Sequence, residues 1–101
     1  QKFKEVSKYP AVVRDISFVV NKGFVPNNYF DLVRDIFGDL VERVELIDTY
    51  ENVEKLGEGK VSYAYRLTYR SLDRTLTNEE VNTLHAKLEA ATVKNFQATI
   101  R

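Results

Sequence analysis

Apolar and polar residues alternate over residues 14–20 and 61–70. A period of two is typical of strands, because successive side chains point to opposite faces of a sheet. In the first stretch one face carries Ile16, Phe18 and Val20, and the other carries Asp15, Ser17 and Val19. In the second stretch one face carries Tyr63, Tyr65, Leu67 and Tyr69, and the other carries Ser62, Ala64, Arg66 and Thr68. We expect the apolar faces, tyrosines included, to line a core.

Two other stretches have helical spacing. Residues 78–93 place apolar side chains on one side, and Thr77 followed by Glu80 predicts a capping box at the start of that helix. An earlier helix, capped by Asn27 or Asn28, would bury Phe30, Val33, Phe37, Leu40 and Val41. Gly38 lies within this pattern and predicts an end or kink there.

The remaining segments complete an alternating order of elements. Residues 43–50 favour a second strand, residues 51–60 a loop, and Phe96, Ala98 and Ile100 a short last strand. The order β-α-β-β-α-β predicts an α+β fold of the ferredoxin-like split β-α-β type. This fold has a four-stranded antiparallel sheet with two helices on one face.

Composition narrows the class of protein. A chain of 101 residues forms one domain, here residues 1–101. It begins at Gln1 and contains no methionine, so we expect a fragment of a larger chain or a processed chain. The net charge of zero argues against a free-standing nucleic-acid binder, since those carry a basic surplus. It permits a module attached to a larger RNA-binding enzyme.

Few residues suggest catalysis. The chain has no cysteine and one histidine, His85, which we expect to be a hydrogen-bonded residue at the surface or core boundary. We find neither a phosphate-binding glycine loop nor a metal-ligand cluster in the sequence. The sheet face without helices would instead present small and polar residues with one cation, a surface on which unstacked bases can settle. Any solvated sheet face has the same pattern.

Four segments, in this order, carry a family resemblance. They are Lys-Tyr-Pro-Ala-Val-Val-Arg-Asp-Ile-Ser-Phe-Val-Val at residues 8–20, Val-Glu-Leu-Ile-Asp-Thr-Tyr at 44–50, the strand at 59–69, and Arg-Ser-Leu-Asp-Arg-Thr-Leu-Thr-Asn-Glu-Glu-Val-Asn at 70–82. Together they resemble the anticodon-binding domain at the C-terminal end of phenylalanyl-tRNA synthetases. The resemblance covers nearly the whole chain, and that family has the ferredoxin-like fold.

The resemblance implies an RNA site. In the family, residues at the ends of three strands hold the first anticodon base, and these positions fall on Ser17, Asp48, Tyr50 and Ser62. A carboxylate at Asp48 would accept from guanine, and Tyr50 would stack on the base. Many family members have Ala or another small residue where Ser17 stands. Apart from the resemblance, the basic residues Arg66, Lys60, Arg70, Arg74 and Arg101 are candidates for phosphate contacts, and for each of them the competing interpretation is a solvated surface charge. Arg66 lies on the open face and completes the predicted RNA site.

One feature of the second strand conflicts with this site. Strict alternation places Asp48 and Tyr50 on the same face as Val44 and Leu46. Either a bulge intervenes, or one pair of residues lies beyond the core at the strand end.

The resemblance also implies a parent enzyme. This domain would have no cofactor and no catalytic residue, and the parent would use ATP and magnesium elsewhere. Its partners would be the anticodon loop of tRNA(Phe) and the remainder of the synthetase, including the alpha subunit in a bacterial enzyme. The loop at 55–60 and the ending at 98–101 favour a bacterial, cytoplasmic origin. The segments 28–34, 38–42 and 46–48 look organellar instead and would place the domain in the mitochondrial matrix.

Two other functions suit this fold class. One is a regulatory domain that binds a small ligand, as ACT domains do, and we keep it as the alternative. The other is an acylphosphatase-like enzyme, but residues 21–24 do not match the phosphate-binding loop of that family.

Overall fold

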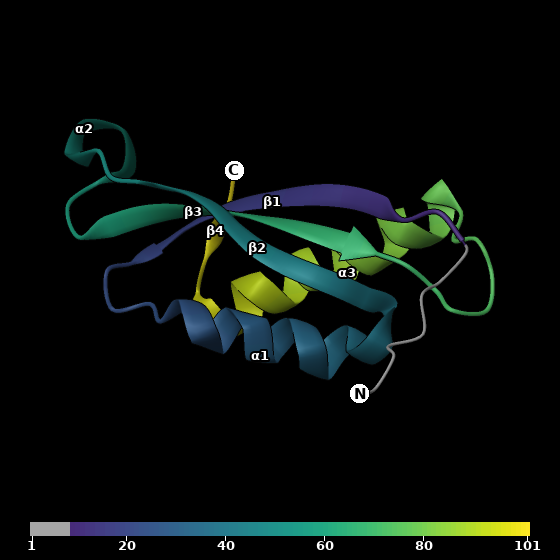
Figure 1. The fold of residues 1–101 in the computed structure, drawn as a ribbon. Helices are drawn as coiled ribbons and strands as arrows, with labels where there is room; N and C mark the ends of the chain where they lie inside the picture. Colours follow the sequence, from purple (N-terminus) through teal and green to yellow (C-terminus); the bar gives the residue numbers. More distant parts are fainter. Residues whose placement is uncertain (1–8) are drawn as a thin grey trace, which may run out of the picture.

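Four antiparallel strands form one sheet in the order β2-β3-β1-β4, and two long helices cover one of its faces (Figure 1). This computed structural model describes residues 9–101, so the first eight residues of the predicted domain lie outside the described part. The elements are β1 (Val12–Asn21), α1 (Pro26–Phe37), a 3-10 turn (Gly38–Leu40), β2 (Val41–Tyr50), α2 (Val53–Leu56), β3 (Lys60–Tyr69), α3 (Asn78–Phe96) and β4 (Thr99–Ile100). The predicted fold class is confirmed.

The start of α1 differs from the prediction. Its N-cap residue is Val25, whose side chain makes no capping hydrogen bond, and Pro26 follows as the first helical residue. Proline is favoured there because its fixed φ suits a helix. An N–H at this position would have no acceptor within the helix, so proline loses nothing by lacking one. Asn27 and Asn28 therefore lie within the helix, and the predicted asparagine cap is wrong.

The end of α1 is set by Gly38, as predicted. Its φ of 56° lies in the left-handed region that glycine adopts at little cost, and its N–H donates to the carbonyl of Arg34. Leu40 and Val41, which were predicted to continue the helix, lie instead in the 3-10 turn and at the start of β2.

Two further boundaries were predicted wrongly. The loop between β2 and β3 contains the short helix α2, whose N-cap Asn52 accepts from the N–H of Lys55 at 3.1 Å. At the C-terminal end, Phe96 is the last residue of α3 and not part of a strand. Its ring packs against Phe24 and Tyr29, with centroid distances of 5.0 and 5.8 Å. These contacts favour the helical position of Phe96, and they could not be predicted from the alternation of residues 96, 98 and 100.

An aromatic cluster between the sheet and the helices forms the centre of the core. Phe18, Tyr29 and Tyr65 are fully buried, and the ring of Tyr29 lies 4.9 Å from Phe18 and 4.5 Å from Tyr65. The hydroxyl of Tyr29 bonds the buried hydroxyl of Thr92 on α3 at 2.9 Å. Tyr65 and Tyr69 are both fully buried and Tyr63 is half-buried, which confirms that the tyrosine stripe of β3 faces the core.

The capping box predicted at the start of α3 is present. The hydroxyl of Thr77 accepts from the N–H of Glu80 at 3.1 Å, and the Glu80 carboxylate accepts from the N–H of Thr77 at 3.1 Å. A hydrogen bond of 2.6 Å from Arg74 lowers the pKa of Glu80 from its ordinary value and ties the preceding loop to the helix. Thr77 and Glu80 thus satisfy two backbone N–H groups and, through Glu80, anchor Arg74 of the preceding loop.

Replacing Thr77 with alanine should lower the free energy of unfolding by about 1 kcal/mol, because the N–H of Glu80 loses its acceptor. Urea denaturation followed by circular dichroism measures the change. Thr75→Ala is the matched control, since it removes the same hydroxyl from an exposed residue that makes no side-chain hydrogen bond within residues 9–101. Equal losses in the two variants would contradict the capping explanation.

Candidate functional site

A bulge in β2 turns the end of this strand toward the sheet face that the helices leave uncovered, called the open face below. Leu46 pairs with the buried Tyr65, whereas Asp48 pairs with Ala64, and Ile47 between them has no partner in the register. Residues paired across strands share a face. Leu46, although 39% exposed, therefore lies on the face that the helices cover, and Asp48 lies on the open face. The bulge that the sequence offered as one explanation is confirmed.

The next pairs along the strands continue this arrangement. Tyr50 pairs with Ser62, and Ser62 pairs with Val19 of β1. Ala64, the partner of Asp48, pairs with Ser17. Two adjacent rows of the open face therefore hold Asp48, Ala64 and Ser17, and Tyr50, Ser62 and Val19. The four positions predicted from the resemblance lie together, with neighbouring rows about 7 Å apart.

These four side chains differ in exposure. Asp48 is exposed, and Ser17 and Tyr50 are half-buried. Ser62 retains only 4% of its surface. The Tyr50 ring is held at the strand end because its hydroxyl accepts from the Asn52 side chain at 3.0 Å. The cluster thus combines an exposed carboxylate, an aromatic ring and two hydroxyls, which are groups that bind the edges and the face of a flat polar ring.

Arg101 joins this cluster from the opposite edge of the sheet, where β4 ends. Its N–H donates to the carbonyl of Ser17 at 2.9 Å, which continues the pairing of β4 with β1. Its guanidinium donates to the Ser62 hydroxyl at 2.9 Å and lies 5.7 Å from the centre of the Tyr50 ring. The sequence marked Arg101 only as one of several cations, because the register of so short a strand is not visible in the sequence.

Arg66 lies one row further along β3, within the row that also contains Asp15 and Glu45. Its guanidinium binds both carboxylate oxygens of Asp15, at 2.9 and 3.2 Å. This hydrogen bonding lowers the pKa of Asp15 and raises that of Arg66. Both side chains remain half exposed, so Arg66 borders the cluster and faces solvent, but it is held by an acid.

His85 is a hydrogen-bonded boundary residue, as predicted. One ring nitrogen bonds the Tyr69 hydroxyl at 2.9 Å, and the other bonds the backbone carbonyl of Asp15 at 3.1 Å. Since a carbonyl only accepts, the nitrogen that faces Asp15 carries a proton and donates to it. Both nitrogens are thus engaged in joining α3 to the sheet.

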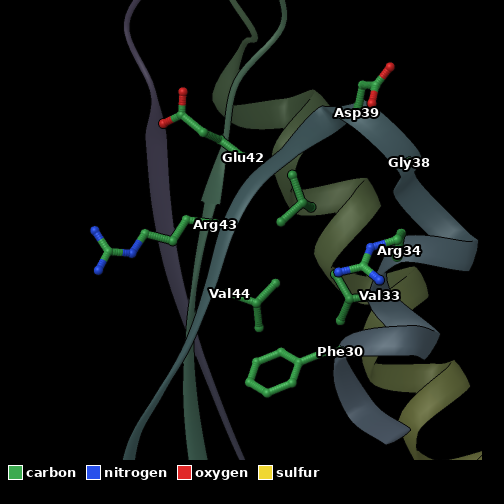
Figure 2. A pocket seen from close by; sticks show the side chains of 9 residues that line it. Phe30, Val33, Arg34, Gly38, Asp39, Glu42, Arg43 and Val44 are labelled. Carbon is green, nitrogen blue, oxygen red and sulfur yellow. The ribbon is translucent and has the colours of Figure 1, made fainter. Parts of the chain in front are cut away.

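A groove of about 300 Å³ lies on the other side of β2, against α1 (Figure 2). Phe30 and Val33 from α1 face Val44 across it. Three of the four charged residues that line it pair with neighbours: Arg34 with Asp31, Glu42 with Arg70, and Arg43 with Glu45. The fourth is Asp39. Because these charges do not converge on the groove, the alternative of a small-ligand regulatory domain gains no support from it.

Residues 9–101 contain no group of three or more histidine, cysteine, aspartate or glutamate side chains placed to hold a metal ion. Within the same residues, no helix has the length and apolar character needed to cross a membrane.

Comparison with known proteins gives one family. The model of the ferredoxin-fold anticodon binding domain matches residues 7–101. The chain is 45% identical over 100 residues to the chloroplastic/mitochondrial phenylalanine–tRNA ligase of Arabidopsis thaliana, covering 99% of this chain and 23% of that protein. It is 40% identical over 106 residues to a probable mitochondrial phenylalanine–tRNA ligase of Drosophila melanogaster, again covering 99% and 23%.

Bacterial proteins match over the same range. The phenylalanine–tRNA ligase beta subunit of Prochlorococcus marinus (strain MIT 9312) is 37% identical over 99 residues, which is 98% of this chain and 12% of that subunit. The chain thus spans less than a quarter of the curated relatives it matches. With the family's match extending over nearly the whole length and the predicted sheet and helices in place, the chain belongs to the ferredoxin-fold anticodon binding domain family.

Proposed function

We propose that this domain recognises the anticodon of tRNA(Phe) as part of a phenylalanine–tRNA ligase. The observation that carries the proposal is the bulge at Ile47, which brings Asp48 and Tyr50 to the open face beside Ser17 and Ser62. The names of the relatives, organellar and bacterial alike, agree with it. Sequence-specific RNA recognition commonly uses such a sheet face to receive unstacked loop bases.

The chemistry of the cluster suits guanine, the first base of the phenylalanine anticodon. A carboxylate only accepts hydrogen bonds, so Asp48 would bind the N–H donors on the Watson–Crick edge of guanine. The half-buried ring of Tyr50 would stack on the base. Ser17 and Ser62 would supply hydroxyl contacts from the centre of the sheet, and Arg66 would contact a phosphate beside the base.

The domain would position tRNA and leave the chemistry to the rest of the enzyme. ATP and magnesium would act in the parent's catalytic part, and the remainder of the synthetase would be the domain's protein partner. The zero net charge predicts weak binding by the domain alone, because few counterions would be released from RNA. Attachment to the parent would replace affinity with effective concentration.

An NMR titration of the chain with a hairpin RNA carrying the phenylalanine anticodon tests the proposal. Amide shifts should appear at Ser17, Asp48, Tyr50 and Ser62, and they should be weaker with a hairpin whose first anticodon base is changed from guanine to adenine. Shifts confined to the groove between α1 and β2, or equal shifts with both hairpins, would count against anticodon reading.

Asp48→Ala should reduce discrimination between the guanine and adenine hairpins by about 1–3 kcal/mol, because the carboxylate no longer binds the base edge. The matched control is Asp39→Ala, which removes an exposed carboxylate from the 3-10 turn beside the groove. Affinities from the same titrations measure the effect. Loss of affinity for both hairpins by an equal factor would remove Asp48 as a base-reading residue.

Tyr50→Ala should weaken binding of the guanine hairpin by about 1–3 kcal/mol, the usual value of one stacked base. Tyr50→Phe is the control, since it keeps the ring and loses only the hydroxyl that accepts from Asn52. It should retain most of the affinity. If alanine and phenylalanine weaken binding equally, the ring does not stack on RNA and the hydroxyl contact matters instead.

A further inference from the structure

Arg101 follows β4 at one edge of the sheet, and Asp48 lies on β2 at the other edge. Register places Asp48, Ala64 and Ser17 in one row, and the bond from the Arg101 N–H to the Ser17 carbonyl extends that row to a fourth residue. The Arg101 side chain does not point to solvent beyond the sheet edge. It reaches back across β1 to the Ser62 hydroxyl on β3.

We propose that Arg101 is a second base-reading residue, which selects guanine by donating hydrogen bonds to O6 and N7 while Asp48 accepts from the Watson–Crick edge. This inference rests on the proposed anticodon recognition and assigns to it a further specificity-determining residue. The base would stack on the part of the Tyr50 ring that the guanidinium leaves uncovered, since the guanidinium lies over that ring 5.7 Å from its centre. The carboxylate and the guanidinium would then approach the base from different sides.

The donor and acceptor pattern of the bases supports guanine as the ligand. Guanine has two acceptors, O6 and N7, on one edge, and arginine is the side chain that most often binds that pair. Adenine replaces the O6 acceptor with an amino donor, which faces a guanidinium unfavourably, and pyrimidines have no N7. A guanidinium only donates and a carboxylate only accepts, so the two together match guanine alone among the four bases.

The contacts of Arg101 position its side chain beside Tyr50 and leave donors of the guanidinium unused. One N–H of its guanidinium donates to Ser62, and the guanidinium has no other hydrogen-bond or ion-pair partner in the part of the chain that the structure describes. Arginine has five such donors, so several remain for a ligand. The buried Ser62 and the backbone bond to Ser17 fix the side chain near the Tyr50 ring, which reduces the entropy lost on binding.

Three hairpins separate the two edges of the base. They carry guanine, 7-deazaguanine or inosine at the first anticodon position, and the adenine hairpin of the earlier titration is measured beside them. 7-deazaguanine lacks the N7 acceptor, and inosine lacks the amino group. NMR titrations give the affinity of each hairpin for the unaltered chain, Arg101→Gln and Asp48→Ala. Arg34→Gln is the charge-matched control, because Arg34 is an exposed cation on α1, on the helix side of the sheet.

The unaltered chain should bind guanine about fivefold more tightly than 7-deazaguanine, as expected for one bond of a bidentate pair. In Arg101→Gln this ratio should fall toward one, while the preference for guanine over inosine persists. Asp48→Ala should show the reverse, and Arg34→Gln should keep both preferences. Amide spectra of the free variants check that the fold is retained, which the exposure of Arg101 favours.

Other outcomes overturn the inference in distinguishable ways. If Arg101→Gln keeps the 7-deazaguanine ratio but weakens all hairpins equally, Arg101 contacts phosphate and does not read the base. If the unaltered chain already binds the 7-deazaguanine and guanine hairpins equally while rejecting inosine and adenine, anticodon recognition stands and the role of Arg101 falls. If the unaltered chain shows no preference for guanine over adenine, both proposals fail.

Discussion

The unbroken pairing of β1 with β3 is the constraint on which the rest of the structure depends. Each residue from Val12 to Asn21 pairs with one from Tyr69 to Lys60 without a shift in register. Because side chains alternate along both strands, this register places Phe18 and Tyr65 in the core and Ser17 and Ser62 on the open face. A slip of one residue would exchange the two faces, so stability and the candidate site rely on the same ladder.

Local signals in the sequence were sufficient for β1, β3 and the start of α3, because alternation and the capping box act over a few residues. Features set by distant contacts were missed. Tyr29 was not placed in the core, although it is fully buried among aromatic rings from β1 and β3. The aromatic packing of Phe96 and the approach of Arg101 likewise depend on residues far away in the chain.

The candidate site was partly visible in the sequence. The family resemblance indicated four positions, and alternation conflicted with two of them, because a bulge leaves no clear mark in residue types. The charged residues of the open face are balanced, with Arg66 held by Asp15 and Arg101 opposite Asp48. A surface of this kind offers hydrogen-bond donors and acceptors with little net charge, which agrees with a chain whose net charge is zero.

The bulge at Ile47 has a second consequence, for association between molecules. β2 is the outer strand of the sheet, and its free edge would offer evenly spaced N–H and C=O groups to a strand from another molecule. The register of β2 with β3 shifts at two places, between Val41 and Arg43 and between Leu46 and Asp48, and these shifts interrupt that spacing. The irregularity that turns Asp48 outward therefore also makes β2 a poor template for edge-to-edge aggregation, and regularising this strand would remove both properties together.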